Sequence, residues 1–81
     1  MPICFILIGV EPGRERNVYN KLSKSNRIIE HHLVSGEYDI IAKIKVDNPK
    51  SLLGIIKNEV RSIPGVKNTR TLTRLVGGWF L

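Results

Sequence analysis

Residues 35–46 read SGEYDIIAKIKV, a glycine turn that runs directly into an apolar strand, and this stretch decides the fold. From Tyr38 to Val46 the even-numbered positions are apolar, while the odd-numbered positions include Asp39 and two lysines. Because side chains alternate between the two faces of a strand, the even-numbered set shares one face. We expect that face to meet helices. The tight turn at residues 35–37 joins this strand to the apolar strand before it.

Strand and helix signals recur on both sides of this hairpin. Apolar runs bounded by Pro and Gly predict four strands, at residues 3–10, 28–34, 38–46 and 66–75. Helical spacing of apolar residues predicts one helix within residues 14–24 and another after Asn48. The order βαββαβ predicts a ferredoxin-like α+β sandwich, a four-stranded antiparallel sheet with two helices on one face. We expect one domain, residues 1–81.

The second helix carries the clearer signals. Asn48 can cap it, Pro49 suits its first position, and Pro64-Gly65 ends it. Its apolar stripe consists of residues three or four apart, namely Leu52, Ile56, Val60 and Ile63, and Leu53 widens the stripe.

The last strand is ambiguous from its pattern. Three hydroxyls share one of its faces, those of Thr69, Thr71 and Thr73. Arg70, Leu72 and Arg74 share the other face. The alternation does not decide which set looks inward.

The size of the chain favours self-association. A domain of 81 residues buries only roughly 60–65% of the surface that its unfolded form exposes. Most of its apolar residues lie in strands whose two faces both look apolar, a pattern expected when both faces are covered. One face can pack on the chain's own helices, and we expect the other to pack on a partner.

Charge and cysteine content bound the compartment and the partners. The net charge of +6 raises nucleic-acid binding as a possibility, but the basic residues are scattered, which favours a solvated surface over a phosphate-binding patch. The single cysteine, Cys4, forms no internal disulfide, and no signal peptide precedes the fold, so we expect a cytoplasmic protein. The longest apolar run, residues 3–10, is far shorter than the roughly 20 residues of a membrane-spanning helix, so no membrane partner is expected.

Three motifs resemble those of one known family. Gly36-Glu37-Tyr38-Asp39 opens an apolar strand, Asn48-Pro49 opens a helix, and Ile63-Pro64-Gly65-Val66 precedes Thr69-Arg70-Thr71. In this order and spacing, over nearly the whole chain, they resemble the effector-binding domain of the Lrp/AsnC transcription regulators. In that family it is called the RAM domain, for regulation of amino-acid metabolism.

The resemblance implies dimers formed through the sheet, dimers that associate into rings, and a small effector, usually an amino acid, bound between dimers. Regulators of the family carry a helix-turn-helix ahead of this domain, whereas here the first strand begins by Pro2, so we expect a stand-alone form. We expect no sequence-specific nucleic-acid binding, since both helices are committed to the sheet. Such a domain could co-assemble with full-length Lrp/AsnC regulators, or sense or buffer an amino acid within its own oligomer.

The turn at residues 36–39 supplies the first candidate ligand contacts. Asp39 can pair with the ammonium of a free amino acid, since charge-assisted contacts are the stronger ones. The alternative for Asp39 is a turn-capping role in which it accepts from backbone amides. Gly36 suits a turn with positive φ, and exposed amides there, next to Glu37, can hold a carboxylate. Tyr38 is either core or pocket wall.

The last strand supplies the remaining candidates. Thr69 and Thr71 are either ligand contacts or ordinary strand formers, whose hydroxyls reflect β-propensity. The resemblance places Leu72 where the effector's side chain is discriminated, although an interface leucine is the simpler account.

The sequence shows no residue pattern typical of a catalytic site or a metal site. His31 and His32 are strand neighbours that point to opposite faces, which defeats joint ligation of one metal. Cys4 reads as a small core hydrophobe, and no phosphate loop or catalytic triad occurs. We therefore expect no cofactor, no metal and no enzyme activity. A dimeric α+β barrel enzyme remains the alternative on topology, and an RNA-binding module is disfavoured because the third strand lacks central aromatics.

The terminal sequence Gly77-Gly78-Trp79-Phe80-Leu81 places three large apolar residues after a flexible pair. We expect this segment to dock on a neighbouring subunit or on the chain's own sheet edge.

Overall fold

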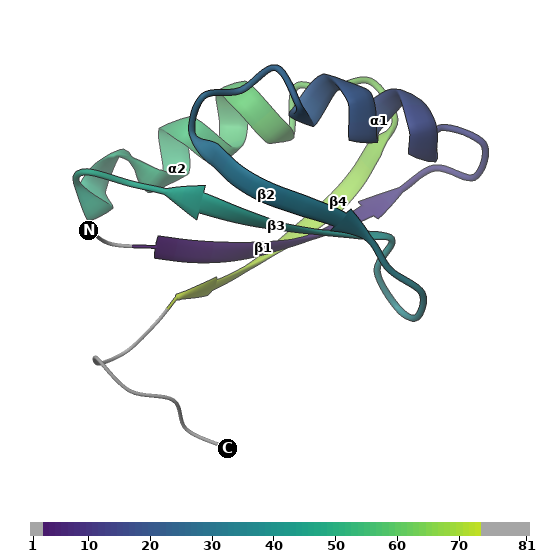
Figure 1. The fold of residues 1–81 in the computed structure, drawn as a ribbon, viewed down its shortest axis with the longest axis horizontal. Helices are drawn as coiled ribbons and strands as arrows, with labels where there is room; N and C mark the ends of the chain where they lie inside the picture. Colours follow the sequence, from purple (N-terminus) through teal and green to yellow (C-terminus); the bar gives the residue numbers. More distant parts are fainter. Residues whose placement is uncertain (1–2, 74–81) are drawn as a thin grey trace.

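The computed structural model describes residues 3–73 (Figure 1). The strands are β1 (Ile3–Val10), β2 (Ile28–Leu33), β3 (Ile40–Lys45) and β4 (Val66–Thr73). Helix α1 (Glu15–Leu22) connects β1 to β2, and η1 (Pro49–Ser51), α2 (Leu52–Ile55) and η2 (Ile56–Val60) connect β3 to β4. The predicted βαββαβ order is confirmed, and each described strand boundary lies within two residues of its predicted position.

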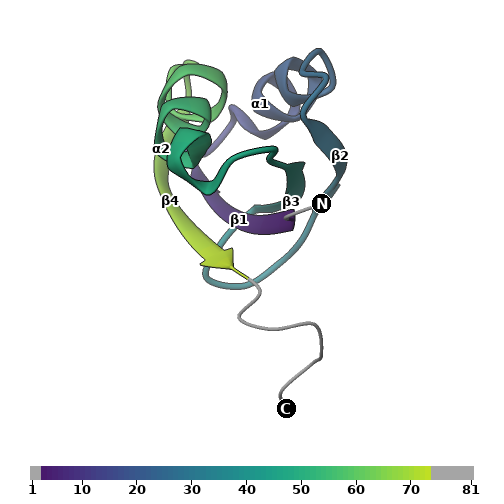
Figure 2. The same ribbon diagram turned by 90° about the vertical axis from the view of Figure 1, so that its left-hand side faces the viewer.

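The four strands form one antiparallel sheet in the order β2-β3-β1-β4. Figure 2 shows the helical segments above the same face of this sheet, with α1 over the β2 side and α2 over the β4 side. β1 and β3 are the central strands. This is the predicted ferredoxin-like sandwich.

The core lies between the sheet and the helices. β1 contributes alternate residues to it, including Ile6 and Ile8, which are fully buried. β3 contributes Ile40, Ala42 and Ile44, at most 1% exposed, so the face predicted from the even-numbered positions is confirmed. The helices add a further buried set from their inner sides, consisting of Val18, Leu22, Ile55, Ile56 and Val60.

Strand pairing resolves the ambiguity of β4. Thr71 lies opposite Ile6 and Thr69 opposite Ile8, and residues directly opposite in a sheet share a face. Both threonines are half-buried on the helix side. Arg70 and Leu72 therefore lie on the uncovered side.

The connection from β3 to β4 is less regular than the predicted helix. Asn48 caps its start as expected, because its Oδ1 accepts from the backbone N–H of Lys50 at 2.9 Å. The helix then widens into a π-helical segment over Ile56–Val60. Leu53 was expected in the apolar stripe, and that was wrong, because its side chain is 80% exposed. It lies about 100° around the helix from Leu52, and Ile55 is buried instead.

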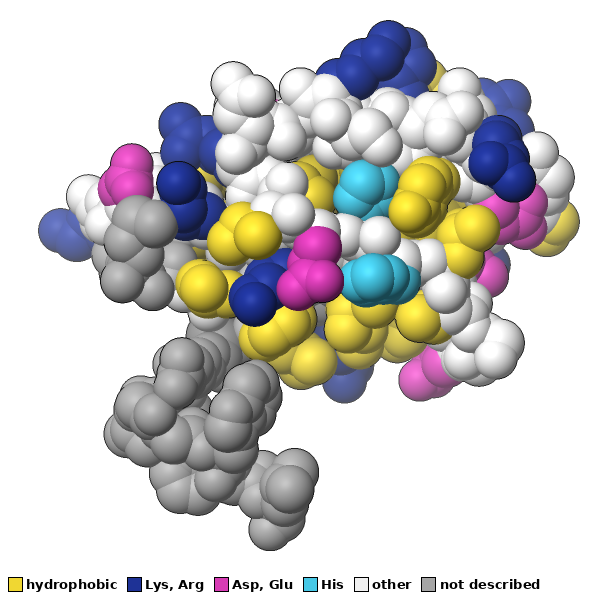
Figure 3. All heavy atoms as spheres, in the orientation of Figure 1, with side chains coloured by type: hydrophobic (Ala, Val, Ile, Leu, Met, Phe, Trp, Pro, Cys, Tyr) yellow, Lys and Arg dark blue, Asp and Glu magenta, His cyan; other side chains and the backbone are white. Residues whose placement is uncertain are grey.

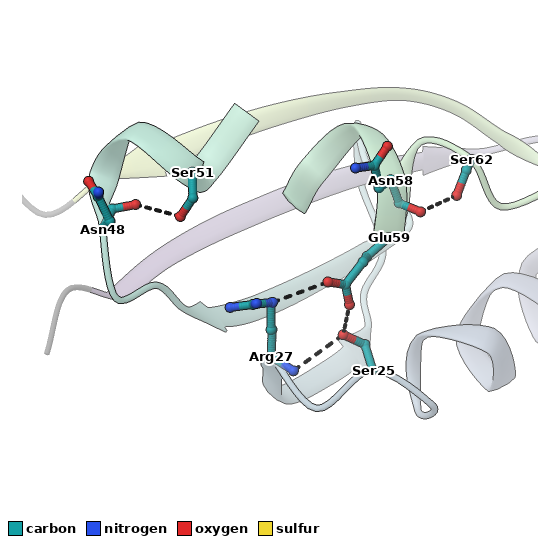
Figure 4. A network of polar contacts seen from close by, with 7 residues as sticks. All are labelled: Ser25, Arg27, Asn48, Ser51, Asn58, Glu59 and Ser62. Atoms are coloured by element: carbon teal, nitrogen blue, oxygen red, sulfur yellow. Dashed lines mark hydrogen bonds and ion pairs between the residues drawn. The ribbon is translucent and has the colours of Figure 1, made fainter. Parts of the chain in front are cut away.

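A polar network ties the irregular helix to the connection between α1 and β2 (Figure 4). Ser25 Oγ donates to the Glu59 carboxylate, and Arg27 Nε lies 3.2 Å from Glu59 Oε2. Figure 4 shows Glu59 pointing down from η2 toward both residues. This network bridges two segments that are more than thirty residues apart in sequence.

Within residues 3–73, no helix covers the second face of the sheet. Phe5, Leu7, Ile41 and Leu72 occupy this uncovered face, and Leu72 is 46% exposed. Figure 3 shows hydrophobic side chains along the lower edge of the described surface, below the helices. The apolar character predicted for both faces is thus confirmed. The Trp79-Phe80-Leu81 segment lies outside the described residues.

Candidate ligand-binding site

One end of the sheet brings the candidate turn close to the end of β1 and the start of β4. Ile8 of β1 lies opposite both Ile40 of β3 and Thr69 of β4. The connection from β2 to β3, which carries the turn, projects from this end below the sheet on its uncovered side (Figure 1). Two segments thirty residues apart in sequence therefore flank the same end of β1.

Asp39 is hydrogen-bonded to β1 on one side and to Val34, which follows β2, on the other. Its backbone N–H donates to the carbonyl of Ile8 at 3.0 Å, and its carbonyl accepts from Val34 at 2.8 Å. Its carboxylate Oδ2 accepts from the backbone N–H of Val10 at 2.8 Å. The backbone-capping role weighed for Asp39 is therefore present. It leaves Oδ1 with no protein partner within residues 3–73.

The contact between Asp39 and Val10 coincides with an irregularity in β1. The pairing of β1 with β4 shifts register between Gly9 and Val10, as at a β-bulge. Bulges interrupt the ladder and redirect groups near functional sites. The Asp39 carboxylate accepts from the N–H of Val10 at this bulge, so the end of β1 holds the Asp39 side chain in place.

The turn residues meet the conformational expectation. Gly36 has φ of +129°, a value that side-chain-bearing residues rarely adopt, so the positive φ predicted for it is confirmed. Glu37 beside it is exposed, whereas Tyr38 is half-buried. The turn therefore presents its backbone and one carboxylate to solvent next to the anchored Asp39.

The candidates of β4 do not join the turn on one face. Thr69 and Thr71 lie on the helix side of the sheet, whereas alternation from buried Ile40 places Asp39 on the uncovered side. Leu72 is on the same side as Asp39 but lies opposite Phe5, about 13 Å along the strand from the Gly9 row. A single chain therefore brings together only part of the predicted set.

Sequence reasoning missed Asn68, which lies on the same face of the sheet as Asp39, with Gly9 of β1 between them. Asn68 is paired with Gly9, and its Oδ1 occupies the space that a Cβ of residue 9 would need. A glycine inside a strand often marks a close approach of another group, and Gly9 in an otherwise apolar strand carried that signal.

The two histidines behave as the strand alternation predicts. His31 lies opposite Ala42 on the helix side, where its ring packs 4.3 Å from that of Tyr19. His32 is on the uncovered side, and its Nε2 donates to the Glu30 Oε2 at 3.1 Å. Among residues 3–73 no three metal-ligating side chains come together.

Two groups in the described part of the chain have displaced pKa values. The hydrogen bond from His32, together with Lys43 3.6 Å away, holds the pKa of the exposed Glu30 carboxyl below its ordinary value. Burial raises the pKa of the Cys4 thiol, which suits a core residue rather than a nucleophile. Neither group lies at the turn.

No helix of the described part is long and apolar enough to cross a bilayer.

Comparison with known proteins identifies the family of this chain. A family model described as the Lrp/AsnC ligand binding domain matches residues 3–75. The HTH-type transcriptional regulator FL11 of Pyrococcus furiosus is 37% identical over 70 residues, which cover 86% of this chain and 46% of that protein. The chain thus spans about half the length of the curated relatives it matches.

Solved structures show the same fold. The crystal structure of FFRP-DM1 matches with a TM-score of 0.86 and 35% identity, covering 93% of this chain and all of that one. A transcriptional regulator of Neisseria meningitidis, solved as a complex with L-Met, matches with a TM-score of 0.83. That likeness covers 94% of this chain and 51% of the other at 14% identity, so it shows the fold alone.

The matched domain is a regulatory ligand-binding domain and not an enzyme, which confirms the non-enzymatic prediction. Because the family model covers nearly the whole sequence, this chain belongs to the Lrp/AsnC family and carries its ligand-binding domain.

Proposed function

We propose that this chain senses an amino acid and modulates transcription regulators of the Lrp/AsnC type through ligand-dependent assembly. The observation that carries the proposal is the Asp39 carboxylate, which is anchored to Val10 through one oxygen and keeps the other for a ligand. A free amino acid offers an ammonium that this oxygen can accept from. In this proposal the exposed backbone of the Gly36 turn receives the carboxylate of the same molecule.

The ligand lies at a seam between copies of the domain. One chain separates Asp39 from Thr69, Thr71 and Leu72 by face or by distance. A second copy that presents its β4 to the turn would complete the set, since β4 is an edge strand. The L-Met complex of the Neisseria regulator supports an amino acid as the class of ligand.

Assembly uses the uncovered face of the sheet. Phe5, Leu7 and Ile41 form the middle of this face and are only half-buried within the described chain. Pairing two such faces removes apolar surface from water, at roughly 25 cal/mol per Å². The resulting dimers would then meet in rings through the seams that hold the ligand.

Ligand binding at a shared seam favours the assembled state. A ligand shifts an equilibrium only through its differential affinity for the two states, and a seam exists only in one of them. Full-length regulators with the same interfaces could enter these assemblies. Direct operator recognition forms no part of this function, because α1 and α2 use their apolar sides to cover the sheet. The cytoplasm, where those regulators would meet it, is its expected location.

The test is a thermal-shift screen against the twenty amino acids, with light scattering on the same samples. We expect a ligand that raises the melting temperature and also changes the mass. Asp39→Asn keeps an acceptor for Val10 but removes the charge, so it should lose the response and keep the dimer. Asp47→Asn is the matched control, since Asp47 is exposed beyond the opposite end of β3. Equal responses of the parent and Asp39→Asn would refute the assignment of Asp39.

A further inference from the structure

Asn68 and Gly9 form a built feature on the uncovered side of the sheet. Gly9 is buried although it lies on this side, because the Asn68 side chain lies over it. Any side chain at position 9 would collide with Asn68 Oδ1. Because Gly9 of β1 has no side chain, the carboxamide of Asn68 on β4 has room to lie over it.

This carboxamide lies in the same row of the sheet as Asp39. Gly9 pairs with Asn68 on β4, and continuing the pairing of Ile8 with Ile40 sets Gly9 beside Asp39. The backbones of Asp39 and Asn68 are thus two strand spacings apart, about 10 Å. Gly9 is the residue of β1 between them, and the Asn68 side chain lies over it, so no side chain of β1 separates the carboxylate from the carboxamide.

The carboxamide of Asn68 is available for a ligand. Within residues 3–73 it makes no hydrogen bond, although it offers two donors and one acceptor. Asn68 is exposed, and its Oδ1 lies beside the Gly9 backbone, in the space that a Cβ of residue 9 would need.

We infer that Asn68 is the specificity-determining residue of the site, selecting an amino acid whose side chain carries an uncharged polar group. This inference rests on the proposed function, in which Asp39 holds the ammonium. The ligand's side chain would then extend over Gly9 toward Asn68. A carboxamide or hydroxyl there can both donate to and accept from Asn68.

Other side-chain classes fit this position less well. An alkyl side chain of the same shape would leave the Asn68 carboxamide desolvated and unpaired. A charged side chain would gain no ion pair from Asn68, because the carboxamide is neutral. Sites built to hydrogen-bond a ligand group reject analogues that lack it more strongly than apolar pockets reject an added group.

Calorimetric titration with two nearly isosteric pairs tests the inference: asparagine against leucine, and glutamine against methionine. For the parent protein we expect the amide-bearing member of at least one pair to bind about tenfold or more tightly than its alkyl partner. Asn68→Leu should remove or reverse that preference. Asn20→Leu is the matched control, because Asn20 is exposed on α1, on the opposite side of the sheet from the turn, and it should keep the preference.

A second variant tests the role of Asn68 without substituting Asn68 itself. Gly9→Ala places a methyl group where Asn68 Oδ1 lies, so it should weaken the preference as Asn68→Leu does. Circular dichroism of each variant checks that it folds.

The outcomes separate this inference from the proposed function. Amino-acid binding whose selectivity is the same in the parent, Asn68→Leu and Gly9→Ala would overturn the role of Asn68 and leave the sensing function standing. Tighter binding of the alkyl member of both pairs by the parent would also overturn it. A parent protein that binds no amino acid at all would remove both proposals together.

Discussion

Replacing Gly65 with alanine should destabilise the fold more than the same change at Gly36, and the structure separates the two causes. Both glycines have positive φ, +105° at Gly65 and +129° at Gly36. An alanine in such a conformation costs about 1–3 kcal/mol at either position. At Gly36 nothing lies within 4 Å of the added Cβ, so backbone strain is the whole cost.

Gly65 carries a second cost, because its added Cβ would lie 2.8 Å from Arg14 Cβ and 3.2 Å from Val18 Cγ2. Val18 is fully buried and cannot move aside freely. Overpacking of this kind typically costs a further 1–3 kcal/mol or so. We therefore expect Gly65→Ala to lower the free energy of unfolding by about 2–6 kcal/mol and Gly36→Ala by about 1–3 kcal/mol.

Urea unfolding followed by circular dichroism measures both values, at one protein concentration because self-association would add to the apparent stability. Gly13→Ala is a control for Gly36→Ala, since Gly13 also has positive φ and open space around its Cβ position. Equal losses at Gly65 and Gly36 would show that the Arg14 and Val18 contacts carry no weight. A neutral Gly36→Ala would contradict the strain argument itself.

Two further predictions concern assembly and pH. Ile41→Glu should weaken self-association at least about tenfold, as seen by sedimentation velocity, because it places a charge on the apolar face proposed as the interface. Leu53→Glu, on the helix layer and 80% exposed, is the control and should leave the mass unchanged. A dimer that tolerates Ile41→Glu would exclude this face as the interface. The pKa of Glu30 is lowered in the folded state, so its contact with His32 stabilises the fold above the ordinary glutamate pKa, about 4.3, and this contribution is lost as the pH falls through the folded-state pKa. Glu30→Gln should flatten the dependence of the free energy of unfolding on pH in that acidic window. An unchanged pH dependence would show that the contact is too exposed to matter.

The hairpin and the central strands could be predicted from sequence because their patterns have a strong period. In β3 a two-residue alternation separates Ile40, Ala42 and Ile44 from two lysines, and burial follows it. β4 offers no such contrast, since threonine is acceptable on either face and both sets look partly polar. Only its pairing with β1 decides that Thr69 and Thr71 face the helices.

The irregular second helix marks a different limit. Spacing alone made Leu53 as plausible a core residue as Ile55, because both extend an apolar stripe that Leu52 and Ile56 begin. The packing of α2 and the π-helical segment on the sheet chose Ile55. A helical period predicts which positions can share a face but not where that face is centred.

The turn of the proposed site could be predicted from the sequence, whereas Asn68 could not. Gly36 and Asp39 are recognisable because they are adjacent in sequence, and the turn chemistry follows from residue type. Asn68 becomes visible only when β1 sets Gly9 between it and Asp39, a relation among three strands. The hydrogen bond from Val10 to Asp39 likewise depends on the register shift at the end of β1.

Asp39 performs an architectural task that is complete before any effector arrives, since its side chain and both backbone groups join the strands on either side of it. Evolution could therefore retain an aspartate here in a relative that has stopped responding to any metabolite. An aspartate at this position in a relative would therefore indicate the same hairpin, and would not by itself show that the relative still senses a metabolite. The groups that carry no structural duty are the more informative markers of what such a relative still recognises.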